Sequence, residues 1–288
     1  MSGSTSLPAD PEGADPSRVP PPARGWWWLV GALAAFALLI LLVAEPWSVQ
    51  TEPTPTEPAL SSPSATLPQP SATPSVSVAP PGSTEIFDAT TSLGLFVTAA
   101  DLVEDVPAAK PGVDELVTSG QVPWGLPAGT VVEPASCVLA VTVVGSPPSF
   151  FDVRGWGNPG MDFRQSVTVL PDPAAAQEAF RELVTTIDAC PTYREIADGV
   201  DGAHWAAQPA IEGQGVYPSV VLRIDRTVDG TTVPGYQGRM LVGNTIVSWT
   251  AQALSAETPQ AALATLGDPA SLSAMVQGRA QLAVRALG

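Results

Sequence analysis

Residues 219–253 read SVVLRIDRTVDGTTVPGYQGRMLVGNTIVSWTAQA and carry the strongest strand and turn signals of the chain. Its β-branched and aromatic segments are separated by the turn pairs Asp229-Gly230 and Gly243-Asn244. Strands joined by such short turns pair with their neighbours, so we predict an antiparallel meander. Its strands would cover 219–227, 235–242 and 245–253.

The first of these strands alternates in polarity. Val220, Leu222 and Ile224 occupy one set of positions, and Val221, Arg223 and Asp225 occupy the other. Successive side chains of a strand point to opposite faces of the sheet. We therefore expect the first set to be buried and the second set to face solvent.

Helix signals flank the meander. In LPDPAAAQEAFRELVTTIDAC (170–190), Asp172 suits the N-cap, Pro173 suits the first helical position, and apolar residues recur every three or four positions up to Cys190. A strand over 164–170 precedes this helix, and a C-terminal helix follows Asp268. Shorter helices are expected over 99–106 and 259–266. The fold class predicted for residues 85–288 is α+β, an antiparallel sheet packed with helices.

The segment before this domain has a different character. Residues 25–44 (GWWWLVGALAAFALLILLVA) carry no charge and match the roughly 30 Å hydrocarbon thickness, which predicts one transmembrane helix. Arg18 and Arg24 precede the span, so residues 1–24 are expected in the cytoplasm as a disordered tail, and the rest outside the cell. The alternatives are a cleaved signal peptide and a buried core helix.

Residues 45–84 are rich in Pro, Ser and Thr and contain few large apolar side chains. Such a composition predicts a disordered linker, either glycosylated or unmodified, between membrane and domain. The net charge of the chain is −16, and its Lys and Arg residues are scattered. This excludes nucleic acid as an expected partner, since phosphate backbones need a basic stripe.

The two cysteines, Cys137 and Cys190, both fall in the part expected outside the cell. We predict a disulfide between them, which would stabilise the fold by about 4 kcal/mol on a loop-closure model. Two free buried thiols are the alternative.

The sequence offers little for catalysis. His204 is the only histidine, and it lies beside a tryptophan in a Gly-rich stretch, which is more typical of a structural residue than of a base. No His/Cys cluster, calcium loop or phosphate-binding glycine loop occurs. We therefore predict a protein that is not an enzyme, with no metal site and no cofactor.

Two places are candidates for binding. Phe151, Arg154 and Trp156 lie in a stretch that ends RGWGNPG, which we interpret as a Pro/Gly-rich loop presenting aromatic and cationic groups. The alternative is that Trp156 fills the core below the loop. His204, Trp205 and Tyr217 form a second, weaker candidate rim.

The order of several short motifs resembles a known family. TAADLV (98–103) is followed by PASC (134–137), by DPAAAQEAF (172–180) in a helix that ends at a cysteine, and by GNTIVSW (243–249) before a terminal helix. The chain resembles the actinobacterial sensor domains found outside the membrane on receptor serine/threonine kinases of the kinase H type and on related lipoproteins. The resemblance implies a helix-packed antiparallel sheet with a ligand-binding cleft. Unlike those relatives, this sequence shows no kinase domain, no lipid-acceptor cysteine and only one cysteine pair, so we expect any signal to pass through a partner.

Together these features predict a non-catalytic, membrane-anchored binding or sensor module of an actinobacterial cell envelope. It would be a single-pass protein anchored in the cell membrane through residues 25–44. Its ligand would be a small molecule, a cell-wall fragment or an envelope protein. The alternative from another class is a structural or scaffolding envelope protein that makes protein–protein contacts.

Overall fold

The computed structural model describes residues 84–197, 200–213, 215–255 and 258–288. The predicted cytoplasmic tail (1–24), membrane span (25–44) and all but the last residue of the linker (45–84) lie outside them. Among the described residues, none of the helices combines the length and the hydropathy that a membrane span needs.

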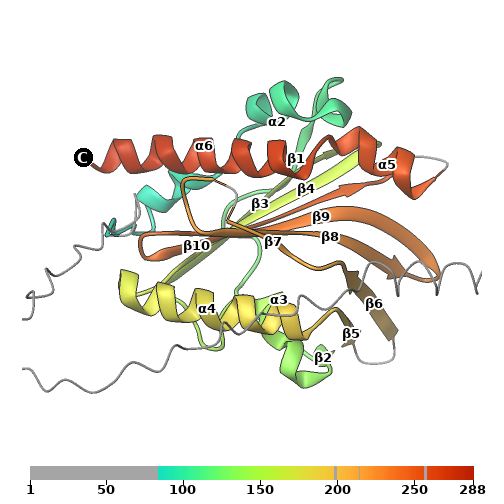
Figure 1. Cartoon of the computed structure of the whole chain (residues 1–288), viewed down its shortest axis with the longest axis horizontal. Coiled ribbons are helices and arrows are strands. Elements are labelled where there is room, and N and C mark those ends of the chain that lie inside the picture. The colour runs from blue at the N-terminus through green and yellow to red at the C-terminus, as the bar shows by residue number, and fades with distance from the viewer. Residues whose placement is uncertain (1–83, 198–199, 214, 256–257) are drawn as a thin grey trace, which may run out of the picture. The chain divides into compact units, whose positions relative to one another are not determined.

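A ten-stranded sheet forms the centre of the fold, with helices on both faces (Figure 1). The strands are β1 (Asp114–Val117), β2 (Val131–Glu133), β3 (Phe150–Asn158), β4 (Met161–Val169), β5 (Thr192–Ala197), β6 (Val200–Ala207), β7 (Ile211–Glu212), β8 (Ser219–Val228), β9 (Thr231–Val242) and β10 (Thr245–Ala253). The helices are α2 (Ala99–Asp105), α3 (Val138–Thr142), α4 (Pro173–Ala189), α5 (Pro259–Leu266) and α6 (Pro269–Leu287), with 3₁₀ turns η1 (Thr91–Leu95), η2 (Pro107–Ala109) and η3 (Ala135–Cys137).

The sheet is antiparallel throughout, in the order β1-β3-β4-β10-β9-β8-β6-β5-β2, with β7 paired to β8. The predicted meander is confirmed as β8, β9 and β10, which are neighbours in sequence and in the sheet. The α+β class is confirmed with it.

Helices cover both faces of the sheet. Figure 1 shows α6, α5 and α2 on one side, here called the α6 face, and α4 with α3 on the other, the α4 face. Val220, Leu222 and Ile224 are buried among residues of α3 and α4, as predicted. Val221 is buried in the larger cluster that includes residues of α6, and Arg223 and Asp225 are half-buried. The prediction of a solvent face on β8 is therefore wrong, because a second helical layer covers it.

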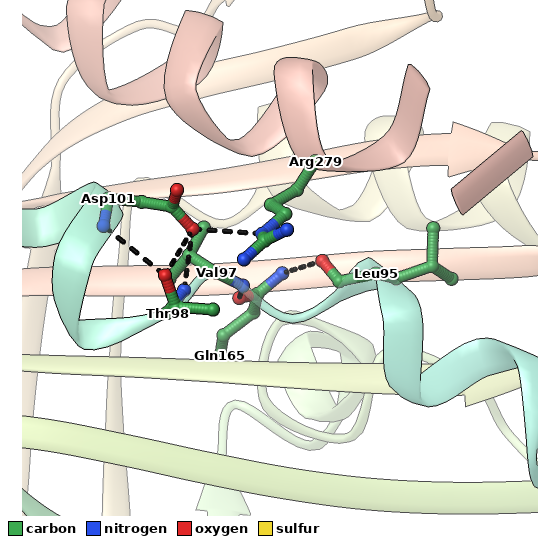
Figure 2. Close-up of polar contacts among 6 residues, drawn as sticks. All are labelled: Leu95, Val97, Thr98, Asp101, Gln165 and Arg279. Atoms are coloured by element: carbon green, nitrogen blue, oxygen red, sulfur yellow. Dashed lines mark hydrogen bonds and ion pairs between the residues drawn. The ribbon is translucent and has the colours of Figure 1, made fainter. Parts of the chain in front are cut away.

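The helices begin where the sequence placed them. The Asp172 carboxylate accepts a hydrogen bond from the Ala175 amide at the start of α4, and Asp268 caps α6 in the same way. At α2, Thr98 and Asp101 form a reciprocal capping box, and Arg279 of α6 donates to the same Asp101 carboxylate at 2.8 Å (Figure 2). This ion pair attaches α2 to α6.

A second polar bridge fixes the N-terminal part of the domain to the sheet. The amide of Gln165 on β4 donates to the Leu95 carbonyl at 2.9 Å and accepts from the Val97 N–H at 2.8 Å (Figure 2). Gln165 is buried, and both ends of its amide are satisfied, which meets the requirement for a polar group in a core.

Asn244, in the turn between β9 and β10, holds the beginning of the domain. Its side chain accepts from the Phe87 amide at 2.7 Å and donates to the carbonyls of Phe87 and Leu170 at 3.0 and 2.8 Å. The preceding Gly243 lies so close to the Glu85 carbonyl that a Cβ there would be 2.0 Å from its oxygen. The Gly-Asn pair thus makes both a turn and a docking point for residues 85–87.

The disulfide is confirmed, since Cys137 and Cys190 are bonded with their Cα atoms 5.7 Å apart. Cys137 lies immediately before α3, and Cys190 is the C-cap of α4. The bond therefore joins the two helical elements on the α4 face.

The loop predicted around Trp156 is not a loop. Residues 150–158 form β3, and only Pro159 and Gly160 make the turn to β4. The glycines serve close packing instead: a Cβ on Gly157 would come within 2.6 Å of Leu116, and one on Gly155 within 3.1 Å of Val117, both on β1.

Candidate ligand-binding pocket

The α4 face of the sheet is not apolar along its whole length. The register places Ser166, Ser248 and Arg239 side by side on β4, β10 and β9. One step along the strands, Arg164, Thr250 and Gln237 form a second row across the same three strands. Alternation puts both rows on the face that carries α3 and α4, beyond the apolar cluster under α4.

These two rows form the floor of a pocket of about 420 Å³. Its walls come from three places: the outer strands β3, β5 and β6, helix α3, and the segment between β1 and β2. Strand β8 adds Arg226, and the wall side chains include Trp124, Val143, Phe151, Val153, Tyr193, Glu195 and Trp205. The volume lies within the range of ordinary small-molecule sites.

Arg239 is the most unusual residue of the floor, because it is a buried cation with 4% of its surface exposed. Its guanidinium donates to the carbonyls of Gly238 at 3.1 Å and Ala140 of α3 at 3.0 Å. The Nε–H has no partner, and none of the ion pairs among the described residues includes Arg239. Burial lowers its pKa to about 10, so it keeps its charge at neutral pH.

Other polar atoms of the floor also lack partners. The Ser248 hydroxyl and the Gln252 amide nitrogen are buried and make no hydrogen bond within the described structure. A buried polar group without a partner costs free energy, and a ligand is one way in which it can be satisfied. The unpartnered groups are mainly donors, which suits a ligand rich in acceptor oxygens.

An aromatic wall closes one side of the pocket. Tyr193 and Trp205 stack with ring centroids 6.0 Å apart, and the Arg226 guanidinium lies 5.6 Å from the Trp205 ring centroid. The Trp205 indole N–H donates to Glu195 at 2.9 Å. Burial raises the pKa of Tyr193 to about 12. The two rings of this wall are held in place by their contacts with each other, with Arg226 and with Glu195.

Helix α3 ends at the pocket with a strained residue. Val143 has φ 69°, in a region that β-branched residues rarely adopt, and it is buried and lines the pocket. Strained backbone of this kind concentrates at functional sites, because it persists only where the surroundings hold it. The strained backbone of Val143 therefore agrees with a functional site at this pocket.

The structure separates the residues predicted from the sequence. Phe151 and Trp205 line the pocket, on opposite walls. Trp156 is 5% exposed and belongs to the core cluster on the α6 face, so the alternative that it fills the core is the correct one. Arg154, on the same face, lies over the Phe96 ring and donates to Ser119. His204 is exposed and lies in a surface depression beside Arg194 and Glu133.

The pattern of β9 could have indicated Arg239, but it was ambiguous. In GYQGRMLV, Gln237 and Arg239 alternate with Tyr236 and Met240, which is also how a solvent-facing strand would look. Ser248 gave no signal beyond its place in a strand. Arg239 and Ser248 become functional candidates because the register sets them side by side.

The arrangement is suited to binding. Ser248 has no imidazole beside it, because the single histidine of the sequence lies outside the pocket. No group of three His, Cys, Asp or Glu side chains positioned to hold a metal occurs among the residues that the structure describes.

No protein-family model matches the chain, and no curated protein matches it in sequence. Among solved structures, the extracellular domain of PknH from Mycobacterium tuberculosis aligns with 70% of this chain and 99% of its own, with 11% identity and a TM-score of 0.52. The fold resembles that extracellular domain. The resemblance predicted from the sequence is thereby confirmed for the fold.

A second structure, an uncharacterized protein from Mycobacterium smegmatis described as an Rv0999 ortholog, aligns with 62% of this chain and 97% of its own. Its identity is 17% and its TM-score is 0.33, which is too low for a conclusion about the fold.

Proposed function

We propose that this chain is a membrane-anchored sensor or binding module whose folded domain lies outside the cell and captures a small molecule in the α4-face pocket. The extracellular location is supported by the Cys137–Cys190 disulfide, since such bonds persist in oxidising compartments. The likeness to the PknH extracellular domain and the apolar stretch 25–44 agree with it.

The pocket is the observation that carries this proposal. It combines a volume of about 420 Å³, aromatic walls and a polar floor with unpartnered atoms, which is the usual composition of a small-molecule site. A structural or scaffolding protein would have no need of such a floor. The large apolar side chains exposed on the surface, such as Ile86, Leu116, Val131 and Leu282, come from separate elements.

A pocket-filling variant tests the proposal. Thr250 is a half-exposed floor residue, so Thr250→Phe should fill the pocket without opening the core. The matched control is Thr232→Phe, at an exposed position of β9 outside the pocket. Full-length protein in mild detergent would be screened by thermal unfolding against fractions of an envelope extract.

We expect compounds that stabilise the wild type and Thr232→Phe but not Thr250→Phe. A ligand at 100 times its dissociation constant adds about 2.7 kcal/mol, which is readily measured. A Thr250→Phe protein that folds normally and responds to the same compounds with the same shifts would rule out this pocket as the binding site.

A further inference from the structure

We propose that the pocket recognises a small organic acid, a molecule with a carboxylate or phosphate group, and that the Arg239 guanidinium binds this group. The inference rests on the proposed function and specifies its ligand class.

The positive charge of Arg239 is not balanced by its neighbours. Two carbonyl oxygens accept from its guanidinium, but carbonyls are neutral and leave the positive charge uncompensated. Burying a cation without a counter-charge is costly unless an anion or further hydrogen bonds offset it. The fold maintains this cost at the floor of a pocket, where a bound anion would relieve it.

Two carboxylates line the pocket, Asp162 and Glu195, and each is a candidate counter-charge for Arg239. Asp162 is paired with Arg164, its neighbour on the same face of β4, at 3.2 Å. Glu195 accepts from the Trp205 indole at 2.9 Å. Neither forms an ion pair with Arg239.

The balance of charges around the pocket also favours an anion. Three arginines (Arg164, Arg226 and Arg239) and two carboxylates line it, so it carries an excess positive charge in a chain of net charge −16. An anion is therefore favoured locally although the protein as a whole repels it. Ser248, next to Arg239 in the register, adds a hydroxyl that can donate to an acid oxygen.

The apolar walls of the pocket indicate what the rest of the ligand is. Phe151 and Val153 of β3 and Trp205 of β6 face the pocket from its two sides. A purely inorganic anion would leave these apolar walls uncovered. The geometry therefore favours an acid with an apolar or aromatic body of a size that about 420 Å³ admits.

Simple aromatic probes test the inference. Benzoate and phenyl phosphate carry the two acid groups, and benzamide is the uncharged match in shape. Their affinities for the full-length protein in mild detergent would be measured by ligand-observed NMR and calorimetry. We expect both acids to bind at least about tenfold more tightly than benzamide, because charge-assisted hydrogen bonds are the strong ones.

Variants then assign the effect to Arg239. Arg239→Gln should lower the affinity of both acids to that of benzamide and leave the affinity of benzamide unchanged. Arg239→Lys should retain part of the preference for the acids. Arg223→Gln, which removes a half-buried arginine from the α6 face of the sheet, is the matched control and should change nothing. If Arg239→Gln does not fold, Ser248→Ala, a smaller change in the same row, should still weaken the acids severalfold.

Each result decides between the two proposals. If the acids and benzamide bind equally and Thr250→Phe abolishes all three, the acid inference is wrong and the pocket function stands. If none of the three binds, the acid inference is wrong and the extract screen decides the function. If the acids bind Thr250→Phe as well as the wild type, both the acid inference and the pocket function are wrong.

Discussion

Arg239 and Arg154 are both arginines of the central sheet, but their surroundings differ. Arg239 is buried at the floor of the pocket, where its guanidinium donates to two backbone carbonyls. Arg154 lies over the Phe96 ring and donates to Ser119 on the other face of the sheet. The sequence indicates Arg154 and the buried Trp156 because arginine and aromatic side chains are common at recognition surfaces, and it gives no such indication for Arg239. Burial, which only the fold reveals, distinguishes these residues.

Tyr193 gives a prediction about pH at this scale. Its pKa is raised from 10.0 to about 12, mainly by burial, so the folded protein holds the phenol proton more tightly than the unfolded chain does. The contribution of this residue to stability is present below pH 10 and is lost as the pH rises toward 12.

Replacing the phenol tests this dependence. Tyr193→Phe cannot ionise. Between pH 9.5 and pH 11.5, its free energy of unfolding should therefore fall by about 2 kcal/mol less than that of the wild type. Urea unfolding at several pH values would measure the difference. Parallel curves for the two proteins across this range would contradict the assignment.

At the level of elements, the sequence predicted those with strong local signals. The caps Asp172 and Asp268 and the turn pairs of the meander are local chemistry, and the structure confirms the helix starts and the turns. The predicted start of the second meander strand at 235 is wrong, because β9 begins directly after the turn, at Thr231. The sequence does not predict the extent of β3, because glycines usually indicate turns, whereas Gly155 and Gly157 here make room for β1. It does not predict the second covered face of β8 either, because alternation cannot reveal a helix that arrives from elsewhere in the chain.

The Cys137–Cys190 disulfide contributes both to stability and to the shape of the pocket floor. It holds α3 to the end of α4, and α3 supplies the Ala140 carbonyl that Arg239 binds. Replacing both cysteines by serine, Cys137→Ser with Cys190→Ser, should lower the free energy of unfolding by about 2–4 kcal/mol. It should also weaken benzoate binding, because the floor loses its support.

Chemical denaturation with and without a reductant provides the measurement and its control. The reductant should destabilise the wild type and leave the double serine variant unaffected. A wild type equally stable in both conditions would show that the bond contributes nothing to the fold.

For the whole molecule, the predicted topology requires a test outside the described residues. Residues 25–44 are expected to cross the membrane with residues 1–24 inside. Because both native cysteines are bonded to each other, an introduced cysteine reports its own location.

In intact cells, a membrane-impermeant maleimide should therefore label Ser61→Cys and not Ser4→Cys. After lysis, it should label both variants. Labelling of Ser4→Cys before lysis would reverse the orientation, and an N-terminus of the mature protein near Glu45 would favour the cleaved signal peptide instead.

In the anchored protein that we propose, the contacts of Asn244 with residues 85–87 have a mechanical consequence. Traction arriving through residue 84 would be borne first by the hydrogen bond from the Asn244 N–H to the Glu85 carbonyl, and then by those between Asn244 and Phe87, at the hairpin that opens into β10. The same strand carries Ser248 four residues further on. A force applied at the N-terminal end of the domain would therefore reach β10, the strand under the pocket. Tension and ligand binding would then act on the same segment of backbone.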